Sequence, residues 1–339
     1  MQPWTKRVGA VAIGRNEGER LRRCLESLQR ETDRVVYVDS GSDDGSPEMA
    51  RARGVEVVDL DMSIPFTASR ARNTGFERLR LRWPEVEFVQ FVDGDMEVLP
   101  GWLQVAVETL DSQPEVVAVI GWRRERHPER SVYNRVCDVE WRMGGVGETE
   151  NFGGDVMFRA EALAEVGGYD TQVIAAEDDE LGVRLRERGG VLLRLDHDST
   201  LHDADMHRFR QWWTRAKRCG HAYAQVSAMH GGGRHRKFVR ELRRAWLMGA
   251  VVPGTAAALT LPTLGLSWLG LGIYPLNAVR IARDTHRRGF DWPDAVVWGV
   301  SCALSPIPQA FGAAKFLLDR VRDKRPEIIE WKGTAKRRR

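Results

Sequence analysis

Cysteine is scarce in this chain of 339 residues, which contains four. They stand far apart and form no CxxC pair, at Cys24, Cys137, Cys219 and Cys302. This spacing indicates neither a zinc site nor a disulfide framework, and it suits a reducing cytosol.

An excess of charge of one sign is also missing, because the formal net charge is only +3. A protein built for nucleic acid needs a basic face throughout, so we expect no nucleic-acid partner. The basic residues gather instead at 234–244 and at 336–339, on either side of the most apolar part of the chain. The apolar run after Lys6 and Arg7 is too short for a signal peptide, and we expect the part before residue 230 to stay in the cytosol.

Two common nucleotide-binding motifs are absent. No GxGxxG follows the first expected strand, which excludes a dehydrogenase of the usual dinucleotide-binding type. No GxxxxGK[ST] is present, which excludes a P-loop nucleotidase.

The first 200 residues alternate between apolar runs typical of strands and segments with helical periodicity. The expected strands are 8–13, 34–39, 55–60, 87–93, 116–121 and 191–195, and the expected helices are 19–28, 46–53, 68–82, 101–111, 161–166 and 178–188. Ser46 is the expected N-cap of the second helix, with Pro47 in its first position. The strands are continuously apolar, so the pattern predicts an α/β fold with a mostly parallel sheet covered by helices on both faces.

Composition predicts four parts. We expect a globular domain over 1–230, a basic linker over 231–244, an apolar helical region over 245–320 and a basic tail over 321–339. Within the first part, the polar, glycine-containing stretch 122–150 is expected to be a mobile loop.

Two apolar segments, 245–279 and 295–314, contain no charged side chain. Spans of that length are typical of membrane association, and a buried helical hairpin on the globular domain is the alternative. A hairpin bent near Pro262 would keep both flanking basic clusters in the cytosol, as the positive-inside rule prefers. Ser305-Pro306-Ile307-Pro308 should break a spanning helix, which favours a re-entrant or interfacial element for the second segment. The expected location is the cytoplasmic membrane, with the globular domain facing the cytosol.

Acidic residues follow two of the expected strands. Asp39 can accept the imide N–H of a uracil-type base, although an aspartate in the turn GSDDGS is also simply a good turn former. Asp93-Gly94-Asp95 can hold a hard divalent ion such as Mg²⁺ or Mn²⁺ while leaving its other positions for a diphosphate. Both turns lie at the carboxyl ends of parallel strands, where open α/β sheets bind ligands.

Six motifs follow one another over residues 8–225: AIGRNEGERLRRCLESL, VVYVDSGSDDGS, SRARNTGFERL, FVQFVDGDMEVLPGWL, FGGDVMFRAEALAEVGGYD and EDDELGVRLRERG. In this order they resemble the GT-A glycosyltransferases, and within them the large family two of inverting enzymes, in its membrane-associated bacterial type. The resemblance implies a GT-A (Rossmann-like) catalytic domain over 1–230. It also implies a nucleoside-diphosphate sugar donor, and membrane attachment makes a lipid-linked or cell-envelope glycan acceptor, and so polysaccharide biosynthesis, the expectation.

The resemblance also assigns site residues. Those expected to bind the nucleotide or donor are Asn16, Glu17, Asp39, Ser40, Arg72, Asn73, Asp93 and Gly94. Those expected on the acceptor side are Gly153, Gly154, Asp155 and Glu177. The metal is assigned to Asp95, and His202 lies where related enzymes often have a histidine near the metal or phosphates; a solvent-exposed or capping histidine is the alternative.

Asp178 matches the family's general base, and its spacing supports this independently. On a helix over 178–188 it shares a face with Leu181 and Leu185, which points it inward. The helix N-terminus should favour the ionised carboxylate that a base requires, and an acid-rich first turn without catalytic role is the alternative. Asp178 is expected to deprotonate an acceptor hydroxyl, which attacks the anomeric carbon and inverts it.

The stretch FRQWWTRAKRCGHAYA at 209–224 is basic and aromatic, a composition that also suits nucleic-acid stacking. An amphipathic helix on the membrane surface is the simpler interpretation, with Trp212 and Trp213 at the interface and Arg215, Lys217 and Arg218 near anionic lipid.

The chain departs from the family in two places. Ser40 stands where many relatives have a second aspartate, which leaves the base unassigned. No QxxRW follows the acidic motif, which favours a single-sugar transferase over a processive synthase. A sugar-phosphate nucleotidylyltransferase and a catalytically silent membrane-bound scaffold with the same fold are the remaining alternatives.

Overall fold

The structure is a computed structural model that describes residues 3–324. The chain forms two compact units, Met1–Arg126 with Gly144–Ala204, and His127–Met143 with Asp205–Arg339. The division expected from the sequence differs from these units at two helices, α5 (Val132–Arg142) and α8 (Phe209–His230), which belong to the second unit. The four-part division remains a prediction, and most of the expected tail lies outside the described residues.

The first unit is built on a nine-stranded sheet in the order β3-β2-β1-β4-β8-β6-β9-β5, with β7 paired to β9. The neighbouring pairs β3-β2, β2-β1, β1-β4 and β6-β9 are parallel, while β8 is antiparallel to both its neighbours and β5 and β7 are antiparallel to β9. The strands are β1 (Val8–Gly14), β2 (Val35–Asp39), β3 (Glu56–Asp59), β4 (Phe88–Asp93), β5 (Met96–Val98), β6 (Val116–Glu125), β7 (Gly147–Glu148), β8 (Met157–Arg159) and β9 (Val191–His202). The sheet is therefore mixed and mostly parallel, as the sequence predicts.

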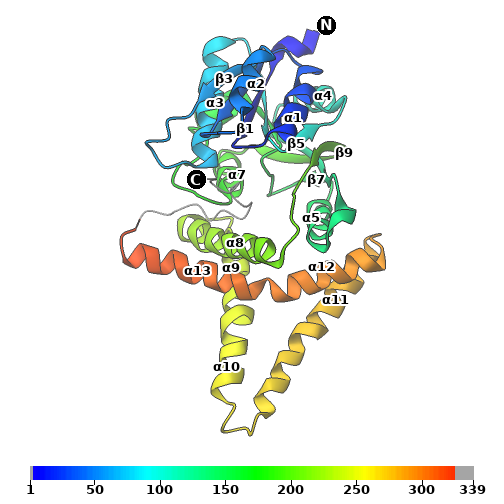
Figure 1. Ribbon diagram of the computed structural model, residues 1–339, viewed down its shortest axis with the longest axis vertical. Helices are drawn as coiled ribbons and strands as arrows, with labels where there is room; N and C mark the ends of the chain where they lie inside the picture. The colour runs from blue at the N-terminus through cyan, green and yellow to red at the C-terminus, as the bar shows by residue number, and fades with distance from the viewer. Residues whose placement is uncertain (1–2, 325–339) are drawn as a thin grey trace. The chain divides into compact units, whose positions relative to one another are not determined.

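Helices cover both faces of this sheet (Figure 1). They are α1 (Glu19–Gln29), α2 (Ser46–Ala52), α3 (Ala68–Arg82), α4 (Trp102–Ser112), α6 (Ala160–Glu165) and α7 (Glu177–Glu187), after a short 3₁₀ helix at Pro3–Arg7. Gly45 is the N-cap residue of α2, so the expectation that Ser46 caps it is wrong by one position. The Ser46 hydroxyl instead accepts a hydrogen bond from the Gly18 backbone N–H at 3.3 Å.

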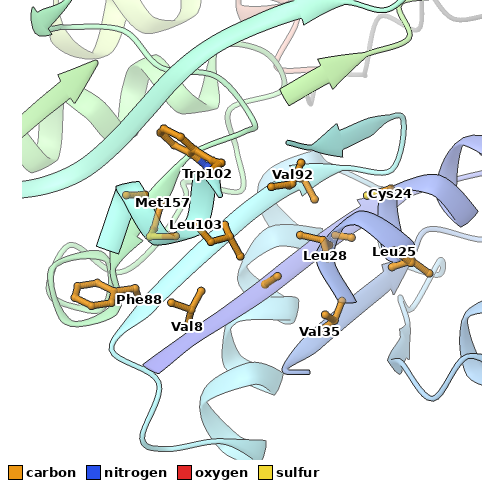
Figure 2. Close-up of a cluster of buried hydrophobic side chains, with 14 of the residues drawn as sticks. Val8, Cys24, Leu25, Leu28, Val35, Phe88, Val92, Trp102, Leu103 and Met157 are labelled. Atoms are coloured by element: carbon orange, nitrogen blue, oxygen red, sulfur yellow. The ribbon is translucent and has the colours of Figure 1, made fainter. Parts of the chain in front are cut away.

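Alternate residues of the central strands supply two separate cores. Val8, with Ala10 and Ala12, packs toward α1 and α4, in a cluster that includes Leu25 and Trp102 (Figure 2). Val11 and Ile13 pack on the opposite face against α3, α6 and α7. This two-residue period fixes the strand register, because a slip by one position would exchange the two faces.

The second unit is entirely helical in its described part. Besides α5 and α8 it contains a 3₁₀ turn (Pro128–Arg130), α9 (Val239–Trp246), a π-helical turn (Leu247–Val251), α10 (Val252–Ala258), a 3₁₀ segment (Leu266–Gly272), α11 (Ile273–Arg287), α12 (Trp292–Leu304) and α13 (Pro306–Val321). Its helices approach closely at glycines: a Cβ on Gly220 would lie 1.9 Å from the Gln309 carbonyl oxygen, and one on Gly312 would lie 1.9 Å from that of Lys217. Close backbone contact at small residues is typical of helices that pack within membranes.

The apolar surface of this unit points outward. Alanines are the most frequent of its buried apolar side chains, and those from α9 onward are Ala245, Ala256, Ala282, Ala295, Ala303, Ala310 and Ala313. Large side chains are exposed, including Leu261 at 86%, Leu264 at 94% and Leu269 at 76%. Leu261 and Leu264 lie in the turn that follows α10, and Leu269 lies in the 3₁₀ segment Leu266–Gly272. α10 and α11 form the arms of a hairpin (Figure 1), and its turn contains Pro262 as the sequence predicts. An apolar exterior over a core of small residues is the reverse of the usual arrangement in water.

One helical run in the described part, Trp292–Val321, is long and apolar enough to cross a membrane. It comprises α12 and α13, and Ser305 between them keeps helical backbone angles of φ −56° and ψ −29°. A turn at Ser305 separates the two helices where the sequence predicts a break, although the helical run continues beyond it, and the re-entrant or interfacial placement remains a prediction. The prolines fall at the first positions of α13, where the missing N–H groups cost little.

Two other expectations are corrected. The stretch 122–150 contains the end of β6 and the whole of α5, so it is not a mobile loop. Trp212 is 7% exposed and its indole N–H donates to the Ser301 hydroxyl at 2.9 Å. Arg215 pairs with Glu140 at 2.6 Å. Both side chains therefore serve packing between helices and are not placed for a lipid interface.

Candidate functional site

Three parallel strands end together at one edge of the sheet. Gly14 at the end of β1 is paired in register with Asp39 of β2, and Ile13 is paired with Asp93 of β4. Asp39 and Asp93 are thus two strand spacings apart, or roughly 10 Å. This distance suits two groups that contact different parts of one ligand.

Arg72 on α3 joins the acidic residues of this edge. Its side chain is 3% exposed, and its guanidinium contacts Asp93 Oδ1 at 2.9 Å and Glu177 Oε1 at 2.7 Å. Asp178 Oδ1 lies 3.9 Å from the same guanidinium, which also sits 5.3 Å from the centre of the Tyr169 ring. One buried cation thereby holds together carboxylates from β4 and α7, which lie far apart in the sequence.

Asp178 occupies the first turn of α7 with its side chain 15% exposed. Leu181 and Leu185, which the sequence places on the same helix face, are buried. The helix begins directly after Ala176, whose backbone lies in the left-handed region at φ 59°. That conformation costs an L-residue on the order of 1 kcal/mol, and here it turns the chain so that the acidic turn reaches Arg72.

The pKa of Asp178 is raised from its ordinary 3.8 to about 8. Burial is the largest cause, Arg72 opposes it, and the charges of Glu177, Asp93 and Asp179 add to it. Burial therefore opposes the ionised form that the helix N-terminus is expected to favour. A carboxylate with a pKa near neutrality is a stronger base than an ordinary aspartate, which suits proton abstraction.

Gly153 and Gly154 lie against two arginines. A Cβ on Gly154 would lie 2.4 Å from Arg72 Nη2 and 2.9 Å from Asp93 Oδ2, and one on Gly153 would lie 2.3 Å from Arg123 Nη2. A side chain at either position would have to displace an arginine head group.

We expect Gly154→Ala to destabilise the protein by about 1–3 kcal/mol, since Arg72 is buried and cannot move aside. Gly145→Ala is the matched control, because no atom lies within 4 Å of a Cβ there. Denaturant midpoints measure both changes, with an effect within about 0.5 kcal/mol expected for the control. Equal losses for the two variants would contradict the close contact at Gly154.

Asp95 and His202 form a second part of this edge. Asp95 lies before β5 and His202 ends β9, with Oδ1 and Nε2 at 3.3 Å and both side chains buried. The pKa of His202 is lowered to about 4, chiefly by burial and also by the charge of Arg123. Its imidazole is therefore neutral at pH 7, the form that binds metals.

These two side chains fit a divalent ion. Two donors on neighbouring positions of one Mg²⁺ or Mn²⁺ lie roughly 3 Å apart, close to the separation found here. No cluster of three or more histidine, cysteine, aspartate or glutamate side chains suited to a metal occurs within residues 3–324. Mg²⁺ sites commonly use one or two carboxylates with substrate phosphates and water, so a pair is sufficient.

Asp39 anchors the turn that follows β2. Its Oδ1 accepts hydrogen bonds from the Tyr37 hydroxyl at 2.7 Å and the Ser42 hydroxyl at 2.5 Å. Its Oδ2 accepts from the backbone N–H groups of Gly41 at 2.9 Å and Ser42 at 2.7 Å. Base recognition by this carboxylate remains a prediction, and in the unliganded protein all its lone pairs serve the turn.

The other expected donor residues also have structural roles. Asn16 joins the loop after β1 to that turn, donating from its backbone to Ser42 Oγ at 2.9 Å and accepting from the Asp43 N–H at 2.8 Å. Asn73 pairs with the backbone of Tyr169 through both amide atoms, at 2.8 and 2.9 Å. These contacts hold the loops that border the site.

Three further expected residues also lie at this edge. Ser40 is buried and donates its backbone N–H to Gly14 at 3.0 Å. Gly94 donates to the Ile13 carbonyl at 2.8 Å, and a Cβ there would lie 3.3 Å from Glu17 Cγ. The loops after β1, β2 and β4 therefore meet.

Arg123 lies in the site, although it belongs to no motif in the sequence. It pairs with Asp155, whose other oxygen accepts from the Thr200 hydroxyl at 2.5 Å. Burial lowers the pKa of Arg123, but Asp155 and the charges of Asp93 and Asp178 raise it by more. The Arg123 guanidinium therefore stays charged. The one local signal was a polar extension of an apolar strand, WRRE, which does not specify a partner.

A mixed sheet with acidic residues at the ends of β2 and β4, and with an acidic helix packed beside them, defines the GT-A glycosyltransferase fold. The mannosyltransferase PcManGT from Pyrobaculum calidifontis, solved in complex with GDP-Man and Mn2+, shares this fold with a TM-score of 0.58 at 20% identity, covering 93% of this chain and 88% of that one. TarS 1-349 of S. aureus in complex with UDP gives a TM-score of 0.51 at 12% identity, over 88% of this chain and 90% of that one. The predicted fold class is confirmed.

Residues 11–167 of the chain match the family model of glycosyl transferase family 2. Among curated proteins it is similar to a glucosyl-dolichyl phosphate glucuronosyltransferase of Haloferax volcanii, 27% identical over 137 residues, which are 35% of this chain and 44% of that protein. The matched segments span 30% to 44% of the curated relatives. This match agrees with the resemblance drawn from the motifs that lie within residues 11–167.

Proposed function

We propose that this protein transfers a sugar from a nucleoside-diphosphate sugar to an acceptor hydroxyl and inverts the anomeric carbon. The observation that carries the proposal is the grouping of Asp93, Glu177 and Asp178 around buried Arg72 at the ligand-binding edge of a family 2 domain. Because Asp178 combines a raised pKa with a place in this group, it is the proposed general base.

In the proposed step, Asp178 takes the proton of the acceptor hydroxyl as the acceptor oxygen forms a bond to the anomeric carbon. The bond from that carbon to the diphosphate oxygen breaks, and the nucleoside diphosphate leaves with the electron pair. Arg72 holds Asp93 and Glu177 in place, and its charge limits repulsion as Asp178 becomes negative. The acceptor enters opposite the nucleotide, beside Gly153, Gly154 and Asp155.

Asp95 and His202 would hold Mn²⁺ or Mg²⁺. A bound divalent ion supplies positive charge to the departing diphosphate, so no protonation of the leaving group is needed. PcManGT was solved with GDP-Man and Mn2+, which supports a divalent ion in this fold.

Melting temperatures measured with a panel of nucleotide sugars, with and without Mn²⁺, test donor binding. A bound ligand raises stability by mass action, so the true donor should raise the melting temperature only when Mn²⁺ is present. Metal-dependent hydrolysis of the same donor separates an enzyme from a silent scaffold. No shift with any nucleotide sugar would contradict the proposal.

We expect Asp95→Asn and His202→Ala each to remove most of this Mn²⁺-dependent shift, since each deletes one of two protein donors. His207→Ala is the control, because its exposed imidazole contacts Asp205 in the other unit. A full shift in both Asp95→Asn and His202→Ala would remove these residues from the metal site.

For the acceptor, we propose a lipid-linked or cell-envelope glycan. The name of the H. volcanii relative includes a lipid phosphate, and the second unit has the exterior of a membrane-attached protein. From Arg244 to Ala258 the first arm of the hairpin extends about 21 Å at 1.5 Å per residue. An arm of that length reaches into a hydrocarbon core of about 30 Å without crossing it. Both basic ends of the hairpin therefore stay at the cytosolic face.

A further inference from the structure

A surface groove of about 670 Å³ lies between α9, the π-helical turn and α11. Three arginines line it: Arg240 and Arg244 from the first arm of the hairpin, and Arg280 from the second. They come from segments that end the uncharged run 245–279 at each side. The fold therefore gathers cationic side chains at the level where the charged and uncharged parts of the hairpin meet.

The groove is positively charged. Glu241 is the acidic residue among its lining side chains, against the three arginines. Arg244 donates to the Cys302 carbonyl, and Arg280 donates to Asn277 Oδ1 at 3.0 Å. Within residues 3–324, none of the three guanidiniums forms an ion pair with a carboxylate. Their charge is available to an anion, and guanidinium groups bind phosphate oxygens in a bidentate manner.

The rest of the groove is apolar. Met248, Ile273 and Leu276 line it, and Ile273 and Leu276 are 43% and 73% exposed. These side chains lie on the tip side of the arginines, along arms that lead to the exposed leucines of the turn. The groove thus offers cations at one end and an apolar path at the other, which complements an anionic head group with an acyl chain.

We propose that this groove binds the phosphate head group of an anionic membrane phospholipid, with Arg240, Arg244 and Arg280 contacting the phosphate and the acyl chain lying along Met248 and Leu276. The inference rests on the proposed membrane attachment and adds a specific lipid site to it. The site would fix the depth of the hairpin in the bilayer.

The test measures flotation of the full chain on phosphatidylcholine vesicles with and without phosphatidylglycerol. The groove variant is Arg240→Gln/Arg244→Gln/Arg280→Gln, and the control is Arg243→Gln/Arg283→Gln/Arg287→Gln, which removes the same charge from the same two helices outside the groove. We expect wild type and control to bind phosphatidylglycerol vesicles at least about tenfold more tightly than neutral ones, and the groove variant to lose that preference. Arg240→Gln/Arg280→Gln keeps the bond from Arg244 to Cys302 and should show the same loss with an unchanged melting temperature.

Equal losses in the groove and control variants would overturn the site in favour of general surface charge. Full competition by inorganic phosphate would overturn a lipid ligand. Equal binding of all proteins to both vesicle types would end the inference and leave membrane attachment intact. Failure of wild type to float on any vesicle would contradict attachment itself, while donor hydrolysis in detergent would still report the proposed transfer. Flotation unaffected by Leu261→Ser/Leu264→Ser would contradict insertion of the hairpin tip.

Discussion

Asp178→Asn is expected to lower kcat for sugar transfer by about 10³-fold or more while nucleotide affinity stays near that of the wild type. The amide keeps the shape of the side chain but cannot accept the acceptor's proton. Because this proton moves only during the reaction, the loss should fall on kcat and leave donor binding intact. Turnover assays combined with calorimetric titration of the nucleotide separate the two quantities.

Asp179→Asn is the matched control, since it makes the same change one residue further along α7. It should retain most activity, because Asp179 is the last of the charges that raise the pKa of Asp178. Turnover close to wild type in Asp178→Asn would remove Asp178 from the role of base.

The raised pKa of Asp178 also predicts how stability depends on pH. The unfolded chain loses this proton near pH 3.8, whereas the folded protein keeps it to about pH 8. Between these values the native state binds more protons, so the unfolding free energy of the unliganded protein falls as pH rises. Asp178→Asn should flatten that decline and melt higher than wild type at pH 8, while the rate of the wild-type enzyme should rise as Asp178 ionises.

Arg72→Met is expected to have the second large effect, a loss of about 3–5 kcal/mol in unfolding free energy together with loss of transfer. The substitution leaves Asp93, Glu177 and Asp178 close together without the cation that lies between them. Urea denaturation near neutral pH measures the loss. It should shrink at acid pH, where the carboxylates are protonated.

Arg78→Met serves as the control on the same helix. Arg78 pairs with Glu56 at the surface, where such a pair is worth at most about 1 kcal/mol. Arg72→Lys should recover part of the stability, because it restores the charge without the two-sided contact. A loss in Arg72→Met no larger than that in Arg78→Met would show that the acidic group does not depend on Arg72.

Local pattern was enough to predict most of the α/β elements. The helix expected at 68–82 is found at Ala68–Arg82, capped by Thr67, whose hydroxyl accepts from the Arg70 N–H at 3.1 Å. Strands such as Val8–Gly14 were predictable because a buried strand must be apolar on both faces. The parallel order of the strands was also enough to predict which edge of the sheet carries the acidic turns.

The contacts inside the site could not be predicted in the same way. Arg72 and Glu177 are 105 positions apart, and Arg123 and Asp155 come from different strand ends, so no local spacing relates them. The pKa of Asp178 depends on burial and on neighbours from β4 and α7, which a helix-end argument alone does not include. Likewise Trp212 has the sequence context of an interfacial residue, and only its contact with Ser301 on α12 shows that it is buried.

The anomeric configuration of the product tests the central claim most directly. Once a donor is identified, proton NMR of the transferred sugar, recorded before any equilibration, reports the configuration at the anomeric carbon. One base acting opposite the leaving nucleotide predicts a product inverted relative to the donor. A product that retains the donor's configuration would contradict the role proposed for Asp178 and the single-step mechanism built on it.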